Sequence, residues 1–234
     1  MDKTNITVGQ TRMLISKKDK IQKEGLKILK LIFMYAVGLM MGRAVIFNNM
    51  NPMAMAYFSA VYIDKKNRIW MFFSVLIGLL TAMPIIDALK YALIMILIVS
   101  VNSILDIKGK KPLLVHEGVI AATSCLIITI TAGIIQNNVF NNMFVSLLES
   151  ASIFSLVLIY GRGLKYLFEH EEDKKATNEI LISEAIIMGT AVAGIADITV
   201  MGLGFIEIWI FSVILILGYR HGIGTGAIIG VISG

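Results

Sequence analysis

The stretch LKILKLIFMYAVGLMMGRAVIFNNMNPMAMAYFSAVYI, residues 26–63, decides the fold of this protein. It is apolar apart from two lysines near its start, one arginine and an Asn/Pro turn. Its first arm, residues 26–47, makes about 33 Å of α-helix, enough to cross the hydrocarbon core of a bilayer. Its second arm, residues 53–63, makes only about 17 Å. We therefore expect a membrane hairpin that is either lopsided and tilted or a deep re-entrant loop.

Basic residues flank this hairpin on both sides. The preceding arm, residues 1–25, contains lysines at positions 17, 18, 20 and 23, and the sequence DKKNR follows at residues 64–68. Lys and Arg are retained on the cytoplasmic side of membrane proteins, so both ends of the hairpin belong there. Residues 1–25 are polar and too few to bury a core, which predicts a basic cytoplasmic arm.

The composition identifies an integral membrane protein. Hydrophobic residues make up 57% of the 234 residues and charged residues only 16%, whereas ordinary globular chains carry about a quarter charged residues. The net charge of +5 is explained by short basic blocks between apolar runs, so we expect no nucleic-acid partner. The single cysteine, Cys125, lies in an apolar run and is read as a packing residue, which excludes a disulfide framework.

Further apolar runs follow the first hairpin and alternate with polar turns. We predict an all-α, polytopic transmembrane helical bundle with about seven to eight crossings, in one membrane domain over residues 26–234. The expected spans cover approximately residues 26–47, 53–63, 69–86, 88–105, 113–135, 143–160, 179–196 and 205–219, with an incomplete one at 222–234.

The positive charges support one orientation for all these spans. Of the 21 Lys and Arg residues, 19 lie in segments assigned to the cytoplasm, counting Lys27 and Lys30 in the first helical turns and Arg220 after the span 205–219; the exceptions are Arg43 and Lys90. The basic turn at 106–111 and the mixed-charge loop at 162–178 are both expected inside, and the uncharged turn at 136–142 outside. We therefore predict a bacterial cell-membrane protein with a cytoplasmic N-terminus.

The last residues form a glycine ladder, GIGTGAIIGVISG, at 222–234. Glycines recur every four residues, which would give a helix a smooth face and permit close approach of a second helix. The ladder predicts helix packing within the chain or, less favoured, a contact between subunits. Thirteen residues are too short to span and no charged flank follows, so we expect a longer parent protein. The ladder comprises Gly222, Gly226, Gly230 and Gly234.

Five ionisable residues lie in or near the predicted spans, and such residues are functional candidates by default. Glu117 and Glu184 lie near expected cytoplasmic ends, and Glu149 and Glu207 lie near expected external ends. Modest tilting would bring each carboxylate to headgroups or water. Arg43 precedes the Asn-rich turn, where it is expected as an external anchor or, alternatively, as a buried partner of Glu149 or Glu207.

No catalytic or metal site is predicted in these residues. His116, His170 and His221 lie in separate segments, and the sequence contains no HExxH, CxxC or phosphate-binding glycine loop. The acidic cluster around His170 points in several directions around a helix, so a solvated face is favoured over a cation site. We expect no cofactor in this chain.

Two stretches resemble the membrane region of stage II sporulation protein E, a family found in endospore-forming Firmicutes. The first is MGRA at 41–44 with Pro52 and AYFSAVY at 56–62. The second is NEILIS at 178–183, continuing through Gly194 and Gly218-Tyr219 into the glycine ladder. The resemblance implies a parent protein with a C-terminal PP2C-type serine phosphatase domain, where manganese or magnesium would bind. Its substrate would be a phosphorylated anti-anti-sigma factor, and its action would activate a forespore sigma factor.

For residues 1–234 the resemblance implies no chemistry. It implies a module that anchors the phosphatase in the membrane, helps to place it at the asymmetric division septum and supports self-assembly. The expected partners are the lipid bilayer, further copies of the protein and septal proteins. The alternative that the residues leave open is a small multi-pass transporter or channel subunit.

Overall fold

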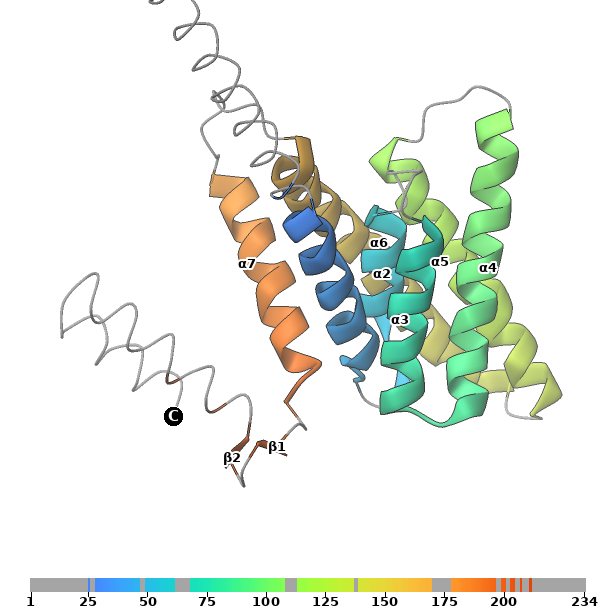
Figure 1. Cartoon of the computed structure of the whole chain (residues 1–234). Helices are drawn as coiled ribbons and strands as arrows, with labels where there is room; N and C mark the ends of the chain where they lie inside the picture. The colour runs from blue at the N-terminus through green and yellow to red at the C-terminus, as the bar shows by residue number, and fades with distance from the viewer. Residues whose placement is uncertain are drawn as a thin grey trace, which may run out of the picture.

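The fold is known from a computed structural model (Figure 1). The structure describes residues 25, 28–46, 49–61, 68–107, 113–136, 139–169, 178–196, 199–200, 203–204, 207 and 211. Expected features outside them, including most of the basic arm, most of the span 205–219 and the whole glycine ladder at 222–234, lie beyond the described residues.

Within this part of the chain, seven helices form a bundle. The first, residues 28–43, is called here the entry helix. The others are α2 (Pro52–Val61), α3 (Arg68–Ala82), α4 (Ile85–Ile107), α5 (Leu114–Ile135), α6 (Val139–Glu169) and α7 (Asn178–Ala193). Two strands of two residues each, β1 (Thr199–Val200) and β2 (Leu203–Gly204), pair in antiparallel fashion after α7.

The short helix α2 lies at the centre of the bundle, in contact with α3, α4, α5 and α6. Its sequence, PMAMAYFSAV, carries no charge, and every residue except Met53 is buried. A helix that is apolar on all sides is stable only where other elements surround it. Ten residues make about 15 Å of helix, half a bilayer core, so α2 is a short buried arm of the hairpin rather than a full crossing.

Large apolar side chains cover the outside of the bundle. The outer faces of α3, α4 and α5 expose, among others, Trp70, Phe73, Leu93, Ile96 and Ile127. Exposure of so large an apolar surface to water is unfavourable, whereas contact with lipid tails is favourable. Membrane contact is therefore the natural environment of this surface.

Three of the described helices, α4, α5 and α6, are long and apolar enough to cross a membrane. The all-helical bundle is thus confirmed in outline. α3 and α7 are shorter, with 15 and 16 residues, and the described part of the entry helix has 16 residues. The expected total of seven to eight crossings stays a prediction, because the described helices show three of spanning length.

Hydroxyl side chains on the exposed faces bond to their own helices. Ser100 and Ser103 in α4, Thr123 and Thr131 in α5, and Ser152 in α6 each donate to the carbonyl four residues earlier, over 2.7 to 2.8 Å. In hydrocarbon a hydroxyl has no water to bond, and this local carbonyl is the partner always within reach. These hydroxyl groups therefore lie on the outer surface but have their hydrogen bonds formed within their own helices.

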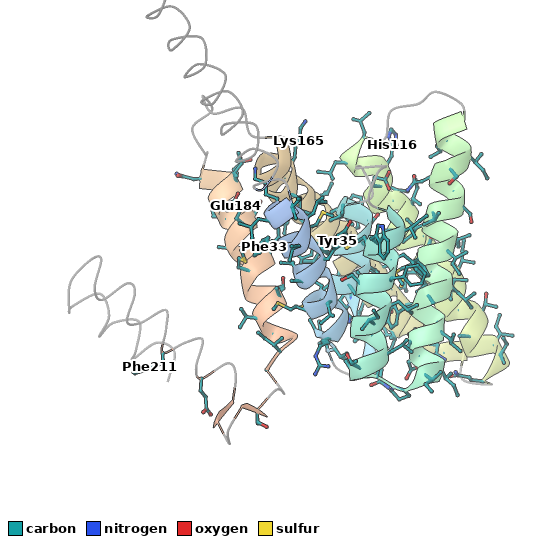
Figure 2. All side chains as sticks on the ribbon, viewed as in Figure 1. Phe33, Tyr35, His116, Lys165, Glu184 and Phe211 are labelled. Carbon is teal, nitrogen blue, oxygen red and sulfur yellow. The ribbon has the colours of Figure 1, made fainter. Side chains whose placement is uncertain are left out.

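The ends of the bundle differ in character. In Figure 1 the α3–α4 turn and the β1–β2 pair lie at the lower end. Figure 2 places His116 and Lys165 at the opposite, upper end. Arg162 and Glu179 form an exposed ion pair between α6 and α7, with 3.2 Å between Nη1 and Oε2. This upper end, with His116, Lys165 and the ion pair, is the one that the sequence predicts to be cytoplasmic.

The orientation can be tested on the two ends of α5. Leu113 precedes the helix and Gln136 follows it, and both are exposed. In a Cys125→Ala background, we expect a membrane-impermeant maleimide to label Gln136→Cys in intact cells, and Leu113→Cys only after the membrane is opened. The reverse pattern would overturn the assigned orientation, and equal labelling of both would show that α5 does not cross.

Candidate functional site: the polar centre of the bundle

Asn51 joins the end of the entry helix to the start of α2. Its Nδ2 donates to the carbonyls of Met41 and Gly42, at 3.1 and 2.8 Å, which are among the last carbonyls of the entry helix. Its Oδ1 accepts from the backbone N–H of Ala54 at 2.9 Å and caps the N-terminus of α2. One buried side chain thus satisfies groups at two helix ends that lack partners within their own helices.

Glu149 of α6 lies against the same helix start. Its Oε1 accepts from the backbone N–H of Asn51 at 3.2 Å and from the hydroxyl of Tyr91 on α4. The Tyr91 oxygen also accepts from Asn51 N at 2.7 Å and lies 3.1 Å from the carbonyl oxygen of Asn49. The carboxylate is only 1% exposed and faces the positive end of the α2 dipole. These contacts tie α2, α4 and α6 together.

The turn before α2 has an unusual backbone. Asn49 has φ 58°, the left-handed region that asparagine tolerates better than most residues. Its Nδ2 donates to Oδ2 of Asp87, near the start of α4, at 2.8 Å in an exposed contact. The turn is therefore fixed by side chains of α4 as well as by its own residues.

A second polar cluster lies further along α2. Glu117 on α5 is fully buried, and its Oε2 accepts from Nδ2 of Asn102 on α4 at 2.6 Å. Ser59 of α2 donates to the Glu117 carbonyl at 3.3 Å. The expectation that Glu117 and Glu149 reach headgroups or water by tilting is therefore wrong. Both carboxylates face the interior because polar groups of neighbouring helices meet them there.

Arg43 ends the entry helix and contacts α7. Its Nε donates to the carbonyl of Gly194 at 3.1 Å, just beyond the last residue of α7. Among the described residues its hydrogen-bond partner is this carbonyl, and neither Glu149 nor Glu207 forms a salt bridge with it. A cation at the C-terminal end of a helix also complements the helix dipole. Arg43 therefore connects two helices within the bundle.

The remaining expected carboxylates take different places. Glu207 is exposed, and its Oε2 accepts from the N–H of Gly204 at 3.3 Å. Glu184 is half-buried on α7, and its Oε1 is buried without a hydrogen-bond partner among the described residues. The structure thus brings none of the candidates Arg43, Glu149, Glu184 and Glu207 into direct contact with another.

Closely packed glycines hold the entry helix between α3 and α7. A Cβ on Gly42 would lie 2.5 Å from the carbonyl oxygen of Val75 and 2.9 Å from Cα of Gly78. A Cβ on Gly78 would collide with the Leu39 carbonyl oxygen, and one on Gly194 with the Met40 carbonyl oxygen. Backbones this close exclude any side chain at the crossing.

Sequence analysis did not single out these glycines as packing residues. The available signal was the four-residue spacing of Gly38 and Gly42, the same pattern that drew attention to the glycine ladder. Asn51, Tyr91 and Asn102 were also missed. Their types are unremarkable in a membrane sequence, and only the approach of separate helices shows what they bond.

The polar side chains at this centre connect helices to one another through hydrogen bonds. Within the described ranges no group of three or more His, Cys, Asp or Glu side chains could hold a metal ion. Cys125 is buried, with its Sγ 3.8 Å from the Thr129 hydroxyl oxygen. The polar groups form hydrogen bonds between helices and leave one carboxylate oxygen of Glu149 without a partner.

Comparison with known proteins identifies the family. Neither the curated proteins nor the solved structures gave a match. The family model described as "SpoIIE, N-terminal domain" matches residues 2–234, almost the whole chain. The outward apolar surface and the three helices of spanning length agree with a membrane region. The chain therefore belongs to the family of SpoIIE N-terminal domains.

Proposed function

We propose that this domain anchors a sporulation phosphatase in the bacterial cell membrane, helps to place it at the asymmetric septum and supports its self-assembly. The observation that carries the proposal is the family match over residues 2–234, which makes the chain a SpoIIE-family membrane region. The phosphatase domain, its manganese or magnesium and its phosphorylated anti-anti-sigma substrate belong to the parent protein in this proposal.

The arrangement of the described helices supports an anchoring role. Their buried polar side chains bond helix to helix, and their exposed surface suits lipid. The glycine ladder, which lies outside the described residues, is favoured to pack within the chain, and a contact between copies through it is the alternative that would provide self-assembly. Small residues every four positions allow two helices to approach closely, which is how contacts between copies form within a membrane.

Localisation is the direct test. A fluorescent protein fused to the chain should label the membrane of sporulating cells and become enriched at the asymmetric septum. The septum contains two membranes, so a multi-pass control protein with the same fluorescent tag sets the enrichment expected without targeting. Enrichment no greater than that of the control would contradict septal placement. Only the membrane-anchoring part of the proposal would then remain.

Self-assembly is tested separately with the double variant Gly226→Leu/Gly230→Leu. Leucine increases hydrophobicity, so the amount of protein in the membrane should be unchanged. Crosslinking between copies should fall, because larger side chains hold helix axes apart. The matched variant Gly226→Ala/Gly230→Ala should crosslink nearly as the parent does. Undiminished crosslinking of the leucine variant would exclude the ladder from assembly.

A small transporter or channel subunit is the second candidate. The observation that favours it is the burial of two carboxylates, Glu117 and Glu149, inside a membrane bundle. Ion or solute flux into proteoliposomes that contain the chain alone would support this candidate. Septal placement without any such flux supports the anchor.

A further inference from the structure

Two neighbouring helices of the bundle, the entry helix and α3, are short for membrane helices. The apolar part of α3, Ile69–Ala82, makes about 20 Å of helix. In the entry helix the uncharged residues 31–42 lie between Lys30 and Arg43, whose Cα atoms are also separated by about 20 Å of helix. The hydrocarbon core of an average bilayer is about 30 Å thick, so this face is about 10 Å short of it.

The ends of α3 add little to this length. α3 begins at Arg68, the last residue of the basic run at 64–68. At its other end the exposed residues Ile85 and Ile86 extend the apolar surface by one layer, and Asp87 follows directly. A hydrocarbon core of average thickness would therefore enclose charged residues. Thinning the bilayer costs less free energy than placing a charge in hydrocarbon.

Two basic side chains fix the external boundary of this face. Nε of Arg43 donates to the Gly194 carbonyl at 3.1 Å, and Nζ of Lys90 lies 4.5 Å from the centre of the Tyr91 ring. Long basic side chains near a membrane boundary commonly extend toward water. Because these two have partners within the bundle, they mark the level at which the hydrocarbon core ends.

The buried polar clusters give a second, independent measure of thickness. Glu149 contacts α4 through Tyr91, and Glu117 contacts the same helix through Asn102. Tyr91 and Asn102 lie about 16 Å apart along α4. In a core of about 20 Å both levels lie close to the headgroups, whereas in a core of about 30 Å both carboxylates would lie deeper, where they are more costly.

The exposed side chains of α3 are suited to lipid rather than to a second helix. Trp70, Phe73, Ile77 and Leu80 are between 46% and 69% exposed. Helices that pack against each other in membranes use small residues, which allow their backbones to approach closely. Trp70 lies near the charged start of α3, where tryptophan is common at the boundary between lipid and water. Lipid is therefore the occupant of this face.

We propose that the face formed by the entry helix and α3 fits a thin bilayer, so that the domain prefers phospholipids with short acyl chains and thins the bilayer around it. A long helix adapts to a thin bilayer by tilting, whereas a short helix cannot lengthen. In Figure 1, α5 and α6 run obliquely to α4. The inference rests on the proposed membrane anchoring and names the lipid that the anchor selects.

Lipid selection can be measured at Trp70. The chain contains two tryptophans, so Trp209→Phe leaves Trp70 alone. This variant is reconstituted in vesicles of brominated dioleoyl phosphatidylcholine, which quenches tryptophan, mixed with dimyristoleoyl or dierucoyl phosphatidylcholine. The short-chain dimyristoleoyl lipid should displace the quencher with an affinity roughly twofold or more above that of the long-chain dierucoyl lipid. Equal affinities, or a preference for the long chains, would overturn the proposal.

A longer α3 should lose this selection. Insertion of Leu-Ala-Leu-Leu between Arg68 and Ile69 extends the apolar part by about 6 Å and leaves the Gly42–Gly78 crossing in place. The affinity ratio should then fall toward one. The matched insertion Asn-Ser-Lys-Asn at the same point is polar and should keep the short-chain preference. If the apolar insertion keeps the preference too, the length of α3 does not select the lipid and the proposal is wrong.

The thinning itself can be measured with the unmodified protein. In vesicles of chain-deuterated dioleoyl phosphatidylcholine, the deuterium order parameters should fall when the protein is added, because shortened acyl chains are less ordered. Unchanged or raised order parameters would contradict the proposal. A chain that inserts normally but shows no lipid preference would contradict this inference and leave the anchoring role intact. Failure to insert into any of these vesicles would contradict both.

Discussion

Gly78→Ala is expected to lower the melting temperature of the purified protein by roughly 5–10 °C, corresponding to about 1–3 kcal/mol of lost stability. A single methyl group suffices because the added Cβ would collide with the Leu39 carbonyl oxygen and lie 2.9 Å from Cα of Gly42. Backbone atoms cannot rotate away as a side chain can. The entry helix and α3 would have to separate, and the packing of Met41 and Val75 in the core would be lost with them.

Gly189→Ala is the matched control for this prediction. Gly189 lies on the exposed face of α7, and an added Cβ would meet nothing within 4 Å. Alanine there should leave the melting temperature unchanged or raise it, because glycine in a helix interior costs about 1 kcal/mol relative to alanine. Thermal unfolding followed by circular dichroism in detergent measures both variants. Equal behaviour of the two would show that the Gly42–Gly78 crossing does not form.

Asn51→Asp is the second substitution with a large expected effect, a loss of about 3–5 kcal/mol. Aspartate keeps the oxygen that caps α2 through the Ala54 N–H. It replaces the amide, which donates to the carbonyls of Met41 and Gly42, by an oxygen that repels them. It also brings a second carboxylate next to Glu149, which already contacts the backbone of Asn51.

The comparison for Asn51→Asp is Asn178→Asp at the first residue of α7. Asn178 is exposed, and a negative charge at the N-terminus of a helix is favourable, so a change within about 0.5 kcal/mol is expected. Resistance to trypsin in detergent and the melting temperature should both fall for Asn51→Asp alone. If both variants behave like the parent, the Asn51 side chain does not join the two helix ends.

Both substitutions act at the junction where the entry helix meets its neighbours. The glycine contact determines how closely α3 approaches, and Asn51 determines how the chain turns back into α2. Arg43 adds α7 to the same junction through the Gly194 carbonyl. This concentration of contacts explains why short helices remain in place beside the three long ones.

The sequence by itself determined the environment and the helical character of this protein. A chain with 57% hydrophobic residues must bury its backbone polar groups in helices if lipid surrounds it. Apolar runs between polar turns therefore predicted helices at 88–105, 113–135 and 143–160, where α4, α5 and α6 lie, although α6 continues to Glu169, into the segment expected as a loop. The short arm at 53–63 was also recognisable, because its length is a property of the chain alone.

The tertiary structure alone decided which polar residues face inward. Glu149 and Glu117 lie near the ends of their apolar runs, so the sequence predicts that their carboxylates reach headgroups or water. In the bundle they meet Tyr91, Asn51 and Asn102 from other helices. A helix in lipid is apolar on most faces, so its sequence carries little periodicity to mark the inner one. The hydrogen-bond partner of a buried carboxylate, and the glycine against which another glycine packs, are set by contacts between helices far apart in the chain.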